Sequence, residues 1–243
     1  MKFNNLVDLI DTEYGQRGDT LGWRWLYSPM QTLSRANVAL VGLNPGGGSY
    51  EPPAPSCEQG SAYATESWGG LPPGHSTLQR QVLSLFSCLG VKADDVLAGN
   101  LVPFRSRSWE ALGNRPAAVT FGQRLWQGVF AAHRPEMIIA MGNTARDALV
   151  EVLGAYDRKY VTVNWGSLVG TYWTLPNGGR LVGLPHLSRY GIITRAVSQS
   201  ALLELFGERY DKDKKLPPSL LPFERGQRES ATDLTLAVPQ PEG

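Results

Sequence analysis

The chain contains 243 residues, of which 42% are hydrophobic, and its 23 basic and 22 acidic side chains leave a formal net charge of +1. A chain of this length can bury one substantial core, and its near-zero charge means that any affinity for nucleic acid must come from a local patch. Two cysteines are too few for a four-cysteine metal site or cluster, and the 3 histidines stand at unrelated spacings, so no metal or other cofactor is expected.

Short apolar runs alternate with helical patterns along the chain. The first run, 38–41, predicts a buried strand that stops at Gly42, because Pro45 and the glycines at 46–48 cannot continue it. A long stretch rich in Pro, Gly and Ser, 51–76, follows at the strand end where α/β sheets bind ligands. Long loops in compact domains are usually functional or disordered, and this position favours a functional loop.

The same patterns predict further elements. These are strands at 95–101, 137–141 and 180–184 and helices at 78–89, 119–132, 144–153 and 193–206. Segment 159–175 alternates only in patches, which fits either a hairpin or an irregular excursion. Because strands and helices alternate, the sequence predicts a three-layer α/β/α sandwich with a central, mainly parallel four-stranded sheet.

The composition changes at Asp211, after which Lys, Pro, Glu, Ser and Gln are frequent and large apolar residues are few. This change predicts a single domain over 1–210 and a polar, flexible tail over 211–243, in which the apolar segment 216–223 is able to dock back. The sequence shows neither a signal peptide nor an apolar run of membrane length. A cytoplasmic location without membrane contact is therefore expected.

Polar side chains stand at the carboxyl ends of three of the predicted strands, namely Asn44, Asn100 and His186. The carboxyl ends of parallel strands meet at one edge of a sheet, so these side chains are expected to lie together. The surrounding sequence lacks the dinucleotide-binding glycine fingerprint, the phosphate-binding P-loop and the nucleophile elbow of serine hydrolases. Each residue alone also has a plainer interpretation: an Asx-turn for Asn44, local backbone contacts for Asn100 and a structural role for His186.

The sequence around these positions resembles the uracil-DNA glycosylase superfamily over roughly residues 37–206. Gly-Leu-Asn-Pro-Gly at 42–46 is similar to the first motif of that superfamily, in the form found in its mismatch-specific and single-strand-selective branches. Asn100 matches an asparagine that ends the second strand, and His-Leu-Ser at 186–188 is similar to a late His-Pro-Ser motif. The resemblance implies a monofunctional DNA glycosylase, a hydrolase that cleaves the N-glycosidic bond of a flipped-out pyrimidine without a cofactor.

The resemblance also implies roles for individual residues. Asn44 and His186 would be catalytic: Asn44 orients the attacking water, and neutral His186 donates a hydrogen bond to O2 of the departing pyrimidine. Asn100 would read the Watson–Crick edge of the base. The remaining base-binding residues are pocket-lining Gly42, Leu43, Pro45 and Gly46, with Tyr50, Tyr63 and Trp68 as candidates for stacking on the base.

Departures from the family pattern bear on rate and substrate. Asn44 stands where some relatives carry aspartate, so no carboxylate activates the water, and Leu187 replaces the motif proline. Strict uracil enzymes place a tyrosine after the first-motif proline, where it blocks a substituent on C5 of the base, whereas this chain has Gly46. The expected substrate is therefore a 5-substituted or otherwise modified pyrimidine, including hypermodified cytosine of phage DNA in a defence role. The alternatives are a uracil or mismatch repair glycosylase, a non-catalytic module that binds modified bases, and a small-molecule hydrolase without DNA affinity.

DNA is the expected partner, and two segments are expected to contact it. Arg105 and Arg107 follow the second motif directly and are placed for phosphates, although a solvated basic loop is the plainer interpretation. Ser188, Arg189 and Tyr190 close the late motif, and Arg189 or Tyr190 is placed to fill the gap left by the flipped nucleotide. No obligate protein partner is inferred, so a monomer is expected.

Overall fold

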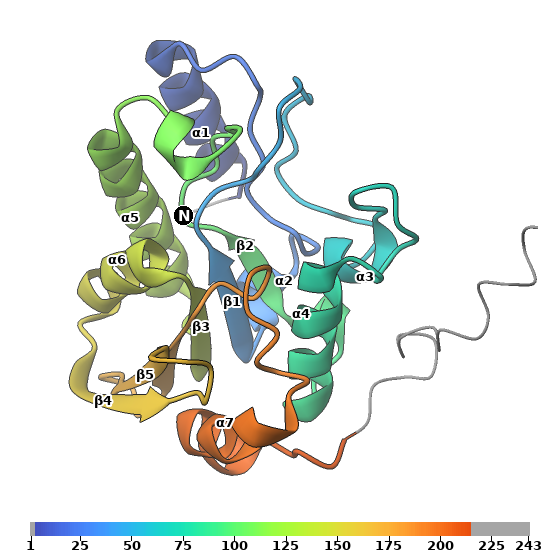
Figure 1. Cartoon of the computed structure of the whole chain (residues 1–243). Helices are drawn as coiled ribbons and strands as arrows, with labels where there is room; N and C mark the ends of the chain where they lie inside the picture. The colour runs from blue at the N-terminus through green and yellow to red at the C-terminus, as the bar shows by residue number, and fades with distance from the viewer. Residues whose placement is uncertain (1–2, 215–243) are drawn as a thin grey trace, which may run out of the picture.

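A six-stranded β-sheet organises the protein, whose computed structural model describes residues 3–214 (Figure 1). In the strand order β2-β1-β3-β6-β5-β4, the first four strands are parallel, and β5 and β4 pair antiparallel. The strands are β1 (Val38–Gly42), β2 (Leu97–Asn100), β3 (Met137–Met141), β4 (Tyr156–Thr162), β5 (Val169–Thr174) and β6 (Arg180–Leu184). The α-helices are α1 (Phe3–Arg17), α2 (Thr32–Arg35), α3 (Ala62–Thr65), α4 (Thr77–Cys88), α5 (Arg115–Ala132), α6 (Asn143–Leu153) and α7 (Gln199–Phe206).

Helices cover both faces of the sheet (Figure 1). One face packs against α1, α5 and α6, and Trp25, Phe121 and Trp126 are fully buried there. The other face packs against α3, α4 and α7, around Phe86 and Leu202. β1 and β3 are buried along their whole length, as parallel strands covered on both sides should be. The predicted α/β/α sandwich is therefore confirmed.

The predicted number of strands was wrong, because the sheet has six rather than four. Segment 159–175 lies within the β4–β5 hairpin, which extends the sheet beyond β6 in antiparallel pairing. Only one residue of β4 is buried, and the strand carries Asp157, Arg158 and Lys159. Charged side chains protect sheet edges from pairing with other chains. An edge strand that buries so little shows no clear apolar alternation in its sequence.

The last helix is shorter than predicted. α7 begins at Gln199 rather than at 193. The backbone N–H of Ile193 donates to the side chain of Gln81 on α4, and a short 3₁₀ turn, Ala196–Ser198, precedes the helix. A tertiary contact therefore fixes the segment that the periodicity assigned to the helix.

The strand order creates one crevice at the carboxyl edge of the sheet. From β1 the chain passes through α4 on one face to β2, and then through α5 on the other face to β3. β1 lies between these two neighbours. Open α/β sheets bind ligands where consecutive connections diverge in this way. The loops after β1, β2 and β6 therefore surround the same place.

The long loop after β1 is held by backbone hydrogen bonds to distant segments. Ala54 donates to the carbonyl of Trp23 at 3.0 Å, and Ser106 donates to the carbonyl of Pro45 at 3.2 Å. The short helix α3 lies within the same stretch. The loop is thus a fixed wall of the crevice.

The tail predicted at 211–243 lies outside the described residues from 215 onward. Between residues 3 and 214 no helix is long and apolar enough to cross a membrane. The same part of the chain contains no group of His, Cys, Asp and Glu side chains suited to holding a metal ion.

Candidate functional site

A cavity of about 560 Å³ opens at the carboxyl edge of the parallel strands. Asn44 reaches it from the loop after β1, Asn100 from the end of β2, and His186 from the loop after β6. Met141, at the end of β3, completes this edge of the lining. The three polar residues that the sequence places at strand ends therefore lie around one cavity.

The side chain of Asn44 is oriented through its amide nitrogen. Nδ2 donates to Oγ of Ser106 at 2.8 Å, with longer contacts to the carbonyls of Pro45 and Phe104 at 3.3 and 3.4 Å. The Ser106 hydroxyl in turn donates to the carbonyl of Ser108 at 2.8 Å. Because Nδ2 is engaged, Oδ1 is the group that is left to accept a hydrogen bond from a water molecule. Ser106 is buried, with 4% of its surface exposed. Sequence analysis did not assign this orienting role to it.

Asn100 is fixed through its backbone, while its side chain faces the cavity. Its N–H donates to the carbonyl of Trp25 at 3.0 Å, and its carbonyl accepts from Nε1 of Trp126 at 2.8 Å. The amide nitrogen Nδ2 is buried and has no hydrogen-bond partner among the described residues, which costs roughly 1–3 kcal/mol unless a ligand supplies an acceptor. A Cβ added at Gly42 would lie 2.9 Å from Oδ1 of Asn100, so the first-motif glycine leaves room for this side chain.

His186 is held in one tautomer. Its Nδ1 accepts from the backbone N–H of Ser188 at 3.3 Å and lies 2.8 Å from the Ser188 hydroxyl. A backbone N–H can only donate, so Nδ1 is unprotonated and Nε2 carries the proton of the neutral ring. Burial lowers the pKa of His186, and the positive charge of Arg189 lowers it further. The ring is therefore a neutral hydrogen-bond donor at neutral pH.

The departure at Leu187 does not loosen this loop. Leu187 is fully buried in the core beneath α4 and α7. The backbone N–H groups of Arg189 and Tyr190 both donate to the carbonyl of His186, at 3.0 and 3.2 Å. A buried apolar side chain and two turn hydrogen bonds therefore hold this loop in place.

Three aromatic rings form another part of the cavity lining. Tyr27, Tyr63 and Trp68 line the cavity, with ring centroids 5.3 to 5.8 Å apart. Burial raises the pKa of Tyr63, which keeps its phenol neutral. Tyr50, which the sequence suggested for base stacking, is 63% exposed and does not line the cavity. Pro45 is also absent from the lining, where Gly42, Leu43 and Gly46 are present.

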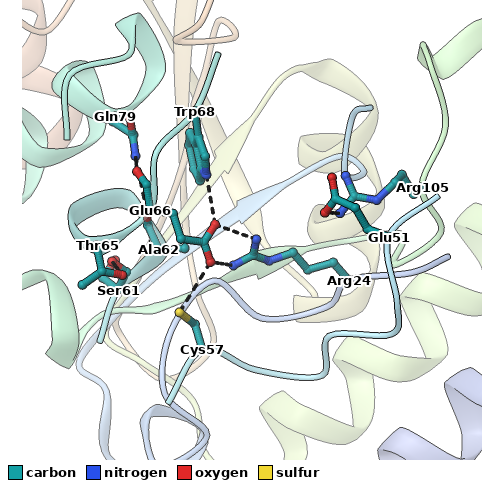
Figure 2. A network of polar contacts seen from close by, with 10 residues as sticks. All are labelled: Arg24, Glu51, Cys57, Ser61, Ala62, Thr65, Glu66, Trp68, Gln79 and Arg105. Carbon is teal, nitrogen blue, oxygen red and sulfur yellow. Dashed lines mark hydrogen bonds and ion pairs between the residues drawn. The ribbon is translucent and has the colours of Figure 1, made fainter. Parts of the chain in front are cut away.

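Two ion pairs line the cavity beside these rings, and sequence analysis identified neither (Figure 2). Arg24 donates to Glu66 through its two terminal guanidinium nitrogens, from Nη1 to Oε2 at 2.8 Å and from Nη2 to Oε1 at 2.6 Å. Burial alone would raise the pKa of Glu66, but hydrogen bonds from Arg24 and Trp68 outweigh it and hold the pKa below its ordinary value. The second pair joins Nη2 of Arg105 to Oε2 of Glu51 at 2.5 Å.

The structure separates the two arginines that the sequence placed together on a phosphate-binding loop. Arg105 is 7% exposed, and its guanidinium donates to the carbonyl of Gly46 and to Glu51. A buried guanidinium with these partners does not fit an exposed phosphate contact. Arg107 is exposed, and its side chain passes beside Gly48.

The rim near His186 carries the other residues expected to meet DNA. Ser188 and Arg189 are exposed. Tyr190 is half-buried, and its ring meets Trp165 edge-on with the centroids 6.0 Å apart. Arg189 is therefore freer than Tyr190 to reach beyond the protein surface.

The fold and the cavity define an α/β protein with a pocket of polar and aromatic side chains at the switch point of its sheet. The chain matches the family model of the uracil DNA glycosylase superfamily over residues 30–204, most of its length, and it belongs to this superfamily. The superfamily acts on DNA, and its members generally hydrolyse the N-glycosidic bond that joins a base to its sugar. A comparison with curated proteins found no match.

Proposed function

We propose that this protein is a monofunctional DNA glycosylase that hydrolyses the N-glycosidic bond of a flipped-out, 5-substituted pyrimidine. The observation that carries the proposal is the convergence of Asn44, Asn100 and His186 on one cavity, each in a form suited to a separate task. Among the described residues, Oδ1 of Asn44 and Nδ2 of Asn100 have no hydrogen-bond partner, and the N–H that His186 accepts at Nδ1 leaves Nε2 to carry the proton of the ring.

These three groups divide the chemistry of bond cleavage. As the bond breaks, negative charge develops on the departing pyrimidine, and the Nε2–H of His186 stabilises that charge at O2. One preorganised donor of this kind contributes about 3 kcal/mol in a site shielded from water. Asn44 holds the water that attacks the sugar carbon. The unpaired amide of Asn100 donates to the Watson–Crick edge of the base. The same hydrogen bond therefore binds the base and selects it.

Water is the nucleophile in this mechanism. None of the described residues lining the cavity is a lysine, so the cavity offers no amine for a Schiff-base intermediate. The products are a free base and an intact abasic strand. Covalent trapping of the protein on DNA by borohydride would contradict this assignment.

Trp68 is the aromatic ring best placed to stack on the base. Tyr63 is 4% exposed and stacked on Tyr27, and the Tyr27 ring carries Arg24 at 4.1 Å from its centroid. Trp68 meets both tyrosines at steep angles, is half-buried, and is oriented by its Nε1–H to Glu66 bond at 3.0 Å. A Trp68→Ala variant should lose affinity for DNA with an extrahelical base more than for normal duplex.

The preference for 5-substituted bases is supported by the space at Gly46. Gly46 is exposed, and a Cβ added there meets no atom of the described residues within 4 Å, so in the proposed orientation of the base no side chain at position 46 blocks C5. The amide of Asn100 can match either uracil or cytosine by turning over, so both parent bases belong to the proposed class. Preference for bulky modified bases indicates action against modified foreign DNA, such as hypermodified phage DNA, whereas preference for plain uracil indicates repair.

The experiment is mass spectrometry of bases released from oligonucleotides that contain uracil, mismatched thymine or a 5-modified pyrimidine. Release of a free base, lost in the His186→Ala variant, supports the proposal. Tight binding of modified DNA without release of any base would show a non-catalytic binding module. A protein without salt-dependent DNA affinity would contradict both and favour a small-molecule hydrolase.

A further inference from the structure

The cavity has a charged wall that the proposed cleavage chemistry does not use (Figure 2). It consists of the Arg24–Glu66 pair and the Arg105–Glu51 pair, and we call these four residues the charged wall. Asn44, Asn100 and His186 make no hydrogen bond to any of them within the part of the chain that the structure describes. None of the four side chains of the charged wall is therefore bound directly to the three residues that carry the cleavage chemistry.

The Arg24–Glu66 pair is held in a fixed position. Trp68 donates Nε1–H to Oε2 of Glu66 at 3.0 Å, and Gln79 donates Nε2–H to the backbone carbonyl of Glu66 at 2.6 Å (Figure 2). Arg24 has 12% of its side chain exposed and lies over the ring of Tyr27. Taking two charges out of water is expensive unless further contacts compensate. These contacts hold the Arg24–Glu66 pair in place before a ligand binds, as preorganisation of a binding site requires.

The charged wall offers donors and acceptors without a net charge. A guanidinium has five N–H groups, and those of Arg24 that Glu66 does not use have no partner among the described residues. Glu51 has 52% of its side chain exposed, and one of its oxygens accepts no hydrogen bond within residues 3–214. A hydroxyl group, which donates and accepts, matches this mixture.

Charged ligands match it less well. A carboxylate on the ligand would be attracted by the two arginines but repelled by Glu51 and Glu66. An ammonium group would be attracted by the two glutamates but repelled by the arginines. Like charges in a poorly hydrated site disfavour binding. An uncharged group avoids both penalties.

The charged wall lies next to Gly46, the residue toward which the proposed orientation of the base directs C5. Nη1 of Arg105 donates to the carbonyl of Gly46 at 2.5 Å, and Gly46 is the residue that leaves C5 unguarded. The cavity of about 560 Å³ falls in the range of pockets that hold drug-sized ligands, which is more than a single pyrimidine ring needs. A substituent that leaves C5 past Gly46 enters the part of the cavity that the charged wall lines.

We propose that Arg24, Glu66, Glu51 and Arg105 form a subsite for an uncharged, hydroxyl-bearing substituent on C5 of the flipped pyrimidine. This proposal rests on the proposed function, because the glycosylase orientation of the base directs C5 toward Gly46. The subsite selects by hydrogen bonding, so it favours a hydroxyl-bearing group over an apolar group of similar size and over a carboxylate.

The test uses oligonucleotides that differ only in the C5 substituent of one pyrimidine: methyl, hydroxymethyl, glycosylated hydroxymethyl or carboxyl. Equilibrium affinity and the single-turnover rate of base release are measured for each. The two hydroxyl-bearing substrates should exceed the methyl substrate by about tenfold, the value of one good hydrogen bond to a charged group, and the carboxyl substrate should rank below them. A methyl substrate equal to the hydroxymethyl substrate, or a carboxyl substrate that ranks first, would overturn the proposal.

The variant R24M/E66L removes both charges of one pair together, so that no unpaired charge remains buried. It should lower the ratio of hydroxymethyl to methyl affinity by about tenfold, and an unchanged ratio would refute the subsite. The matched control is R35M/D95L, which removes the Arg35–Asp95 pair, half-exposed and outside the cavity, and should keep the ratio. If thermal unfolding shows that R24M/E66L does not fold, Glu51→Gln, at an exposed carboxylate, gives the same measurement.

The two readouts separate this proposal from the proposed function. If no substrate releases a base, the glycosylase assignment fails, and the order of affinities still tests the subsite. If bases are released at equal rates and bound with equal affinity whatever their C5 group, the glycosylase assignment holds and the subsite fails.

Discussion

Arg105 and its neighbour Arg107 should have opposite effects when substituted, although both are arginines of one short segment. Arg105 ties the first-motif loop to Glu51, because its guanidinium donates to the carbonyl of Gly46 at 2.5 Å and to Oε2 of Glu51 at 2.5 Å. Its side chain is 7% exposed. The loop that it holds continues directly from Asn44, which orients the water in the proposed mechanism.

The size of the effect follows from these contacts. Arg105→Met removes two charge-assisted hydrogen bonds, each contributing about 1.5–3 kcal/mol, although half-exposed Glu51 recovers part of this by hydration. A shift of the Asn44 loop by about 1 Å is enough to lower the rate by roughly a hundredfold. We therefore expect the single-turnover rate to fall between about tenfold and a hundredfold, with little change in the salt dependence of binding.

Arg107→Met is the matched control on the exposed side of the same segment. It should weaken binding to all DNA sequences alike and reduce the slope of log affinity against log salt by about one. The assay combines single-turnover base release at saturating protein with DNA affinity measured over a range of salt concentrations. If Arg105→Met changes the salt slope as Arg107→Met does, the buried positioning role is wrong.

Arg105→Lys separates charge from geometry. Lysine keeps the positive charge but has no planar fork to bridge Gly46 and Glu51. It should therefore remain slow, close to Arg105→Met. Full recovery of the rate in Arg105→Lys would show that charge alone matters and that the bridging contact does not.

Three further predictions concern the cavity. Asn44→Ala and His186→Ala should each slow single-turnover base release by roughly a hundredfold or more, while the thermal unfolding temperature stays near that of the parent protein. Asn100→Ala should lose rate and also selectivity between bases. Near-normal turnover in His186→Ala would refute the role assigned to His186. The pKa of His186 lies below its ordinary value of 6.5, so the neutral ring persists to lower pH, and the rate falls only as the pH drops through the lowered pKa. Arg189→Met should raise that pKa and move the acid limb of the pH–rate profile to higher pH. An acid limb that does not move would count against the role of Arg189. Gly46→Tyr has open space for its Cβ, which meets no described atom within 4 Å, and it should lose about tenfold or more on a 5-substituted base relative to matched uracil. Equal losses on the two substrates, or none on the bulky base, would show that Gly46 does not keep C5 open.

The sequence by itself determined the layers of the fold and the strand-end residues. A parallel strand buried on both faces is an unbroken apolar run, so β1 and β3 are visible without any knowledge of their neighbours. Asn44, Asn100 and His186 each follow such a run within a few residues. Their convergence is a consequence of parallel strands that end at one edge, a rule that sequence order alone can apply.

Tertiary structure alone decided which charges meet. Arg24 and Glu66 are 42 residues apart, and Arg105 and Glu51 are 54 apart, with nothing in the local sequence around any of them to indicate a partner. The sequence does not distinguish Arg105 from Arg107. In the structure the segment packs against Gly46, which buries Arg105 and leaves Arg107 exposed. Helix and strand patterns arise from short-range periodicity, whereas ion pairs, the burial of a charge and an edge strand such as β4 depend on how distant segments pack.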